Sequence, residues 1–356
     1  MFIVDAHQDI AYNAICFGRD YRLAALRKRQ LEAGTNIPSQ NGYATIGLPE
    51  SIVGRVAIVF ATIFVAPYSK GNAPWNAVMY KDARGAYDLA RQQLDYYYRL
   101  VDSTDRIRLI QSASDMDAVL ETWEDGKPIQ ARQQGIVLLM ENADPILEPK
   151  QLEEWVEGGL RIVAPAWSAS RYTGGTGIPG PLTTLGYELL EMMADFNLML
   201  DVSHMAEQAF FQALDEYEGS VIASHSNPRK FCDTDRHLSD DMIRRLAERD
   251  GVMGIVPYNQ FLKTMWSKGS RKATMPRTII IDVIDHVCQV TGSATHVGIG
   301  TDFDGGFGAE SIPQDMDTIA DIWYVGDLLR ERGYAETDIS AILGGNMLRK
   351  LREILP

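Results

Sequence analysis

Short apolar runs rich in β-branched residues recur along the chain, and stretches with apolar residues at helical spacing follow most of them. An uninterrupted apolar run of about 4 to 8 residues is typical of a strand buried on both faces. Eight such runs predict strands at residues 2–9, 55–65, 135–140, 160–164, 198–202, 221–224, 251–256 and 296–300. The chain is therefore predicted to alternate strand and helix.

Strands that alternate with helices pair in parallel, because each crossover helix returns the chain to the end of the sheet at which the previous strand began. Eight strands indicate closure into a barrel. We predict an α/β fold, a single-domain (β/α)8 TIM barrel over residues 1–356, with additional loops at 11–50 and 259–276 and a C-terminal helix near 336–354. The alternative, a doubly wound open sheet, would predict a glycine-rich phosphate turn after the first strand, which the sequence lacks.

Composition and charge argue against a nucleic-acid-binding protein and a membrane-spanning protein. The 356 residues are 46% hydrophobic and carry a formal charge of -14, which argues against a nucleic-acid partner because such proteins need a basic surface. The longest apolar run, 56–67, is shorter than the roughly 18 to 20 residues that span a bilayer, so no transmembrane segment is expected. Three widely spaced cysteines, and the lack of a recognisable secretory signal ahead of the first strand, predict a cytoplasmic location.

Candidate metal ligands terminate five of the predicted strands. In a βα barrel the active site lies at the carboxyl ends of the strands. The first strand ends in His7-Gln8-Asp9, and because alternate residues of a strand share a face, both charged side chains can reach one ion. The other strand ends carry Glu141, His204, His225 and Asp302.

These six side chains are too many for one zinc ion, which takes about four ligands, whereas two ions that share a carboxylate can use five of them. We therefore assign His7 and Asp9 to one Zn²⁺, His204 and His225 to the other, and Glu141 to both. Two ions about 3.5 to 4 Å apart lower the pKa of a shared water, which yields a bridging hydroxide at neutral pH. The remaining carboxylate, at the end of the last strand, is predicted to act as catalytic base and then acid toward the leaving amine.

The residues around these positions form six motifs: Asp5-Ala6-His7-Gln8-Asp9, Glu141, Asp201-Val202-Ser203-His204, Ser224-His225-Ser226, Asp235-Arg236-His237 and Gly298-Ile299-Gly300-Thr301-Asp302-Phe303-Asp304-Gly305. Together they resemble the membrane (renal) dipeptidase family of metallopeptidases, family M19, within the amidohydrolase-type TIM barrels. The resemblance runs in order from residue 2 to about 352. It implies a binuclear zinc site, hydrolysis of dipeptides and, in many bacterial members, tolerance of a D-residue at the carboxyl end. Members often pair, so a homodimer is a further expectation.

The resemblance also implies substrate-binding residues. Arg236 matches the arginine that holds the substrate's terminal carboxylate, a role that suits the two parallel hydrogen bonds of a guanidinium. From the residues alone, a surface ion pair with Asp235 or Asp240 is the alternative. Tyr258 falls where the family has a Tyr-Asn pair and is predicted to line the pocket, with simple packing as the alternative. Where the family usually has Leu-Thr-His, this chain has Trp167, whose indole donates one hydrogen bond but carries no charge. We hypothesise that nearby Arg171 supplies positive charge to a developing oxyanion.

Three functions remain open at this stage. The first is a zinc-dependent dipeptidase. The second is a related binuclear amidohydrolase that acts on N-acyl amino acids, or on esters or lactones; Arg236 argues against neutral esters, which offer no carboxylate to bind. The third is a non-catalytic barrel relative, against which the complete set of predicted ligands weighs.

Overall fold

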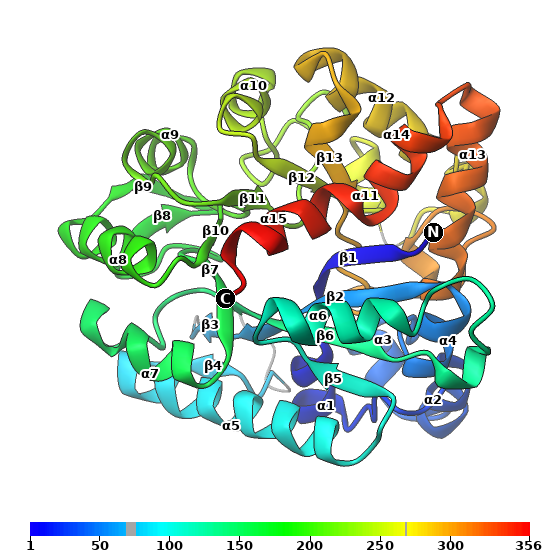
Figure 1. Cartoon of the computed structure of the whole chain (residues 1–356), viewed down its shortest axis with the longest axis horizontal. Helices are drawn as coiled ribbons and strands as arrows, with labels where there is room; N and C mark the ends of the chain where they lie inside the picture. The colour runs from blue at the N-terminus through cyan, green and yellow to red at the C-terminus, as the bar shows by residue number, and fades with distance from the viewer. Residues whose placement is uncertain (69–75, 268) are drawn as a thin grey trace.

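The computed structural model describes residues 1–68, 76–267 and 269–356. Parallel strands pair into a closed ring in the order β1 (Ile3–Gln8), β2 (Val56–Phe64), β6 (Gln134–Glu141), β7 (Leu160–Ala164), β10 (Met199–Asp201), β11 (Val221–Ala223), β12 (Val252–Ile255) and β13 (Val297–Ile299). Pairing of β1 with β13 and of β2 with β6 closes the barrel (Figure 1). The predicted TIM barrel is confirmed.

One strand of this sheet was not predicted. Strand β5 (Ile107–Leu109) pairs with the first residues of β6, so that Ile107 lies opposite Gln134. Farther along, the same flank of β6 pairs with β7, from Leu138 onward. A three-residue strand with an arginine at its centre gives too short an apolar pattern to be recognised from sequence.

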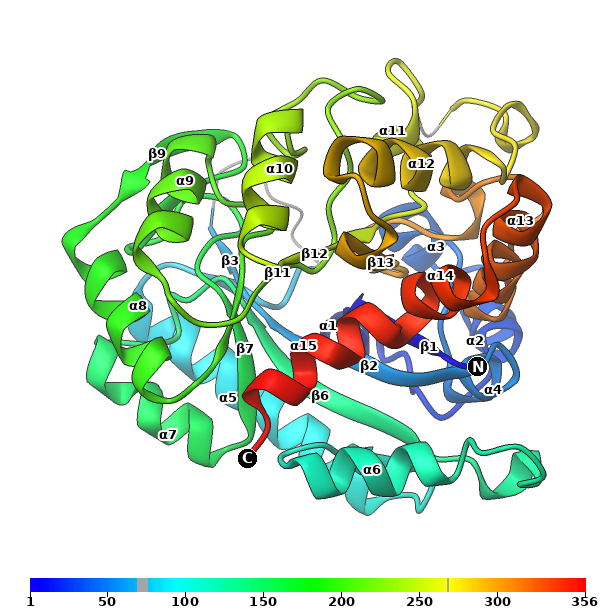
Figure 2. The ribbon, with the colours of Figure 1, turned by 45° about the horizontal axis from the view of Figure 1, so that its top comes forward.

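Helices cover the outside of the barrel (Figure 2): α5 (Ala83–Asp102), α6 (Ala113–Glu121), α7 (Leu152–Glu157), α8 (Thr184–Asp195), α9 (Glu207–Glu216), α10 (Asp240–Glu248), α12 (Ile279–Thr291) and α13 (Tyr324–Arg332). Helix α5 begins after Asp82, whose carboxylate accepts a hydrogen bond from the backbone N–H of Gly85. Its Ala86, Ala90 and Leu94 are buried at helical spacing against the barrel.

The chain ends across the amino ends of the strands. Helix α14 (Glu336–Ser340), a π-helical turn (Ala341–Gly345) and helix α15 (Asn346–Ile354) follow one another, and α15 crosses the barrel in Figures 1 and 2. The side-chain amide of Asn346 donates to the carbonyl of Val297, the first residue of β13, at 2.8 Å. This packing covers the barrel floor, and it leaves the carboxyl ends of the strands for a functional site.

The stretch 11–50 holds four short helices: α1 (Ile10–Phe17), α2 (Ala25–Glu32), α3 (Ile37–Asn41) and α4 (Leu48–Val53). A buried ion pair links the segment after α1 to α2, because Arg19 donates to both carboxylate oxygens of Glu32 at 2.8 and 3.0 Å. Arg19 also donates to the carbonyl of Gly42, which follows α3, at 2.6 Å. The stretch 259–276 begins with helix α11 (Asn259–Leu262); residue 268, within it, lies outside the described residues.

Two small sheets lie beside the barrel. Strands β8 (Thr173–Gly175) and β9 (Ile178–Leu182) form an antiparallel hairpin, and β3 (Ala66–Pro67) pairs in parallel with β4 (Met79–Tyr80). The tip of the β8–β9 hairpin reaches the functional site described below.

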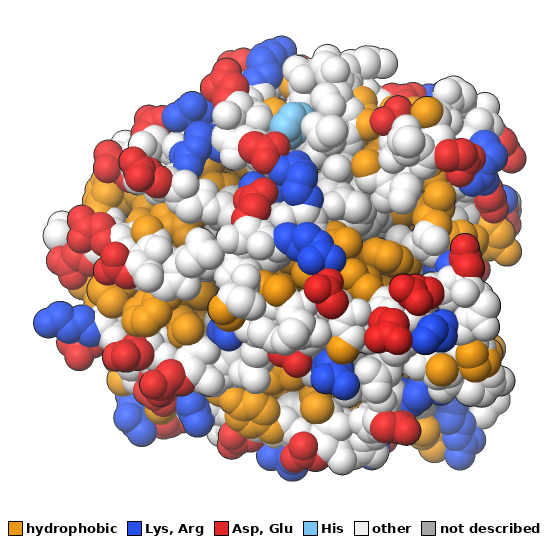
Figure 3. All heavy atoms as spheres, in the orientation of Figure 1, with side chains coloured by type: hydrophobic (Ala, Val, Ile, Leu, Met, Phe, Trp, Pro, Cys, Tyr) orange, Lys and Arg blue, Asp and Glu red, His pale blue; other side chains and the backbone are white. Residues whose placement is uncertain are grey.

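The outer surface carries charges of both signs. On the face shown in Figure 3, acidic and basic side chains are interspersed among uncharged ones. Across residues 1–68, 76–267 and 269–356, no helix is both long and apolar enough to cross a membrane.

Candidate metal centre

The predicted ligands meet at the carboxyl ends of the strands. His7 Nε2 lies 3.6 Å from Glu141 Oε2 and 3.9 Å from Asp9 Oδ1. The other carboxylate oxygen of Glu141 lies 3.3 Å from Nε2 of His204 and 3.3 Å from Nε2 of His225. Glu141 thus presents one oxygen to each half of the cluster, which is the arrangement that the sequence predicted for a shared carboxylate.

These residues form two overlapping groups, His7 with Asp9 and Glu141, and Glu141 with His204 and His225, in each of which the candidate ligand atoms lie within 4.8 Å of one another. His7 Nε2 is buried and has no hydrogen-bond partner among the residues that the structure describes. Buried polar atoms are normally satisfied, so an unpaired imidazole nitrogen that faces carboxylates is well suited to a cation. The donor set therefore fits a metal centre of nitrogen and oxygen ligands.

Hydroxyl groups orient the histidines toward the centre. Ser224 Oγ donates to Asp201 Oδ2 at 2.5 Å, so at 2.8 Å from His225 Nδ1 it acts as the acceptor. These two hydrogen bonds place the imidazole proton of His225 on Nδ1 and leave the lone pair of its Nε2 directed into the metal centre. His204 Nδ1 has an equivalent partner in Thr176 Oγ1, at 3.0 Å, on the β8–β9 hairpin.

Burial and mutual charge shift the pKa values of the cluster. Burial disfavours the imidazolium form, which lowers the pKa of His204 to about 4 and that of His225 well below its ordinary value. For Glu141, burial opposes ionisation, but the charge of His7 holds its pKa well below the usual value. At His204, His225 and Glu141 these effects favour the forms that bind cations, neutral imidazole and ionised carboxylate. At His7, burial is outweighed by the charges of Glu141 and Asp9, which raise the pKa to about 10, so a cation bound there would replace a proton.

Asp302 lies at the rim of the same cluster, with Oδ1 at 3.9 Å from His7 Nε2. Burial raises its pKa well above the ordinary value, with the charge of His7 acting in the opposite direction. Its backbone is left-handed, with φ of 56°, and so is that of Asp304, with φ of 65°. Non-glycine residues adopt this conformation rarely, so the surrounding structure must hold the loop of residues 302–304, which follows β13, in place.

The stretch 11–50 supplies the contacts that hold this loop. The carboxylate of Asp304 accepts hydrogen bonds from the backbone N–H and the hydroxyl of Thr45, at 2.7 and 2.6 Å. Its carbonyl accepts from the side-chain amides of Asn13 and Asn41, at 3.0 and 3.1 Å. All four residues are buried, so the loop that carries Asp302 is fixed by a buried polar network.

A cavity of about 400 Å³ opens over the cluster. Its lining includes Glu141, His204, His225, Asp302 and three of the predicted substrate residues, Arg236, Trp167 and Tyr258. The structure therefore brings these three beside the candidate metal centre.

Arg236 is 7% exposed and is held from behind, since its guanidinium donates to the carbonyl of His225 at 2.6 Å. Within the described residues, no carboxylate lies within ion-pair distance of it, and its neighbour Asp235 instead accepts the backbone N–H of Gly177 at 2.7 Å. Asp240, in turn, pairs with His286. The alternative interpretation of Arg236, a surface ion pair with Asp235 or Asp240, is therefore wrong. A second N–H group donates to Ser226 Oγ at 3.4 Å, and further N–H groups remain for a ligand in the cavity that Arg236 lines.

Arg171 is the predicted site residue that the structure places elsewhere. Its guanidinium donates to the backbone carbonyls of Asp144, Ile146 and Leu147, at 3.1, 2.7 and 3.0 Å. Its Nε lies 3.3 Å from the carboxylate of Asp144. These acceptors occupy the guanidinium outside the cavity lining, so the hypothesis that Arg171 stabilises an oxyanion is wrong.

Some contributors were not predicted. The hydroxyls of Ser224 and Thr176, and the carboxylate of Asp201, orient the histidines. A serine immediately before a ligand histidine at a strand end is a signal that could have indicated Ser224. Thr176 lies in a Gly/Thr/Pro-rich stretch, and nothing in that composition indicates a contact with His204.

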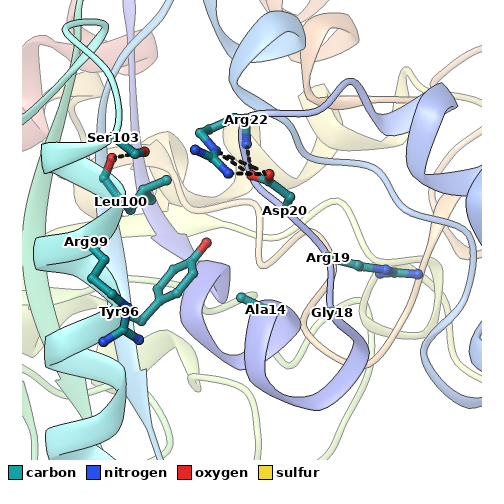
Figure 4. Close-up of a pocket in the computed structure, with 9 residues that line it drawn as sticks. All are labelled: Ala14, Gly18, Arg19, Asp20, Arg22, Tyr96, Arg99, Leu100 and Ser103. Carbon is teal, nitrogen blue, oxygen red and sulfur yellow. Dashed lines mark hydrogen bonds and ion pairs between the residues drawn. The ribbon is translucent and has the colours of Figure 1, made fainter.

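A second cavity of about 390 Å³ lies between α1 and α5 (Figure 4). Arg22 and Asp20 face each other there and pair at 2.7 Å, while Tyr96 and Arg99 come from α5. Arg19 points away from this pair in Figure 4 and binds Glu32. Its described lining contains no histidine or cysteine, and its one carboxylate, that of Asp20, is paired with Arg22, so this cavity lacks the chemistry of the barrel mouth.

Comparison with known proteins gives the family. The model of the membrane dipeptidase family (peptidase family M19) matches residues 1–355. An uncharacterized protein in the pqqA 5′ region of Klebsiella pneumoniae is 30% identical over 278 residues, 75% of this chain and 96% of that protein.

Two solved structures share the fold. The probable dipeptidase PvdM from Pseudomonas aeruginosa aligns with a TM-score of 0.79 at 20% identity, over 99% of this chain and 95% of that one. A metallopeptidase from Rhodobacter sphaeroides, liganded with a phosphinate mimic of the dipeptide L-Ala-D-Ala, aligns with a TM-score of 0.77 at 21% identity, over 99% of each chain. With a family match over nearly its whole length and a fitting ligand cluster, this chain belongs to the membrane dipeptidase family of metallopeptidases, family M19.

Proposed function

We propose that this metallodipeptidase uses two zinc ions per chain and hydrolyses dipeptides, including those with a D-residue at the carboxyl end. The observation that carries the proposal is the position of Glu141, shared between two ligand groups in the same cavity as Arg236. The phosphinate mimic of L-Ala-D-Ala bound by the Rhodobacter sphaeroides metallopeptidase supports the stereochemistry.

The two ions would have separate ligands and one in common. His7 and Asp9 would hold the first, His204 and His225 the second, and Glu141 both. Bound there, the ions supply an activated water as nucleophile and polarise the carbonyl of the scissile amide.

The chain's own side chains orient the substrate and move the proton. Arg236, anchored by the carbonyl of His225, would bind the terminal carboxylate of the dipeptide through its free N–H groups. That contact fixes the distance from the carboxyl terminus to the scissile amide, which favours substrates with a single residue after it. Asp302 would accept the proton of the attacking water on its carboxylate and pass it to the leaving amine.

The experiment is a metal analysis combined with turnover. We expect about two zinc ions per chain, loss of activity with a chelator and its return on adding zinc, with L-Ala-L-Ala and L-Ala-D-Ala as substrates. Arg236→Met should weaken dipeptide cleavage by about 100-fold or more through KM, because a charged hydrogen-bonded pair is lost, while Arg236→Lys should keep part of it. Zinc-loaded protein that cleaves no dipeptide would exclude the proposal.

N-acyl amino acids form a second candidate substrate class, because they also end in the carboxylate that Arg236 would bind. The uncharged rings of Trp167 and Phe64 in the cavity lining favour an acyl group as much as an amino acid side chain. Comparing Gly-Ala with N-acetyl-Ala and N-butyryl-Ala separates the two classes. A preference for the acyl compounds would identify an N-acyl amino acid hydrolase.

The homodimer and the cytoplasmic location stay predictions. We propose both on the resemblance and composition given above. Sedimentation of the zinc-loaded protein at two concentrations would test the first, and localisation of a tagged chain in cells would test the second.

A further inference from the structure

Two groups of aromatic side chains line the cavity. The first, which we call the Trp167 wall, consists of Tyr12, Phe64 and Trp167. The ring centroids of Tyr12 and Phe64 lie 5.7 Å apart, and those of Phe64 and Trp167 lie 5.3 Å apart, both in edge-to-face contact. Such contacts hold rings in a fixed relative orientation, so this wall is a preformed apolar surface.

The second group, which we call the Tyr258 wall, consists of Tyr258, Phe261 and Phe307. Tyr258 stacks on Phe307 with centroids 4.1 Å apart and contacts Phe261 edge-on at 4.9 Å. The guanidinium of Arg236 lies over the ring of Phe261, 5.3 Å from its centroid. The Tyr258 wall therefore lies on the same side of the cavity as the cation that would bind the substrate carboxylate.

The strand order puts the two walls on opposite halves of the barrel mouth. Phe64 ends β2 and Trp167 follows β7, whereas Tyr258 follows β12 and Phe307 follows β13. In the closed ring, β2 and β7 flank β6, and β12 and β13 lie across from it. The candidate metal ligands come from the ends of β1, β6, β10 and β11, which are distributed around the ring, so the metal centre lies near the barrel axis, between the walls.

The positions of Arg236, the two walls and the metal centre determine where the scissile amide would lie. This inference rests on the proposed dipeptidase function. With the terminal carboxylate on Arg236, the carboxyl-terminal residue lies along the Tyr258 wall and the amide lies over the metal centre. The residue before the amide must then extend away from Arg236, toward Trp167. The ring of Trp167 lies 6.2 Å from that of His204, so this wall begins directly beside the centre.

The Trp167 wall belongs to a small apolar cluster separate from the main core, and Ala66 and Val78 are also buried in it. Tyr12 and Phe64 are 8% and 7% exposed, so most of their area already packs inside the protein. The remaining ring surface faces the cavity and presents no charge. An apolar side chain placed there loses contact with water, whereas a charged one loses its hydration without gaining a partner.

We propose that the Trp167 wall is the specificity-determining subsite for the residue on the amino side of the scissile amide. It selects dipeptides whose first residue is large and apolar, such as Leu or Phe, over those that begin with Gly. Trp167 is the determinant, because it joins the wall to the metal centre.

The test compares two substrate series on the zinc-loaded enzyme. In the series X-Ala, with X as Gly, Ala, Leu or Phe, we expect kcat/KM to rise by about 10- to 100-fold from Gly to Phe, the range expected for burying one such side chain. Trp167→Ala should reduce this preference to within about 3-fold, and Trp167→Phe, which keeps a ring, should retain an intermediate preference. The reversed series Ala-X should keep its order in both variants.

Phe261→Leu, on the Tyr258 wall, is the matched control and should alter the Ala-X series instead. A wild-type enzyme that cleaves Gly-Ala as well as Phe-Ala, or a Trp167→Ala variant that keeps the preference, overturns the subsite while leaving the dipeptidase proposal intact. Absence of cleavage of every dipeptide by zinc-loaded wild type overturns both. Zinc content and circular dichroism establish that each variant is folded before its preference is measured.

Discussion

His237 makes the stability of this protein depend on pH in a way that one substitution should reveal. The residue is 1% exposed, and neither ring nitrogen has a hydrogen-bond partner within the described parts of the chain. Its ring contacts Phe261 edge-on at 4.6 Å. Burial, reinforced by the positive charges of Arg236 and Arg229, lowers the pKa of His237 from its ordinary value of 6.5 to about 3.

The direction in which the free energy of unfolding changes with pH follows from proton linkage. Below pH 6.5 the unfolded chain binds a proton at His237 that the folded chain does not, so stability is full above pH 6.5 and falls as the pH drops toward 3. Between pH 7.5 and pH 5.0 the loss from this group is about 2 kcal/mol, obtained from the two pKa values. His237→Phe removes the proton site and retains a ring beside Phe261. The free energy of unfolding of the variant should therefore gain about 2 kcal/mol relative to wild type on going from pH 7.5 to 5.0.

Urea denaturation of both proteins at pH 5.0, 6.0 and 7.5 measures this difference. All other titrating groups, the metal ligands included, are common to the two proteins and cancel in the comparison. Phe261→Leu is the control, because it disturbs the same contact without a titrating group and its difference from wild type should not change with pH. A His237→Phe difference that stays constant within about 0.5 kcal/mol from pH 7.5 to 5.0 would refute the reasoning, since it would mean that His237 titrates alike in both states.

Three further predictions concern the polar contacts. Ser224→Ala removes the acceptor that sets the tautomer of His225, and we expect about 10- to 100-fold weaker metal binding in competition with a chelator; unchanged affinity would contradict this. Tyr97→Phe removes a buried hydroxyl that donates to a carbonyl of β2 and accepts from a backbone N–H of α1, which should lower the free energy of unfolding by about 1 to 3 kcal/mol in urea. Asn41→Ala removes one of the amides that hold the carbonyl of Asp304, so kcat should fall by about 10-fold at unchanged metal content and nearly unchanged KM. A proportional loss of zinc would instead indicate a role in folding.

The barrel could be predicted because its strands are marked by local pattern. Each long apolar run, such as the one that forms β2, needs burial on both faces, and only a sheet covered by helices provides it. The ligands could be predicted for the same reason, since a strand fixes which way its last side chains point. Residues such as His7 and Glu141 are therefore placed by the elements that carry them.

Side chains on loops could not be placed in this way. Arg171 lies a few residues after the end of β7, close enough in sequence to reach the cavity. Its guanidinium instead donates to the carbonyls of Asp144, Ile146 and Leu147. That competition depends on how two loops pack together, which the local pattern does not contain. The contact of Thr176 with His204 could not be predicted for the same reason, because it depends on the turn between the short strands β8 and β9.

The network around Asp304 joins residues that are made at very different times during translation. Asn13 and Asp304 are 291 positions apart, and Asp5 accepts the hydroxyl of Thr301 across 296 positions. A nascent chain that stops before residue 297 carries the five proposed metal ligands, but its first strand lacks β13 as a neighbour and the loop that carries Asp302 is missing. The ribosome must therefore release nearly all of this sequence before any copy can hydrolyse a peptide, and closure between the earliest and latest segments should be among the slow steps of folding.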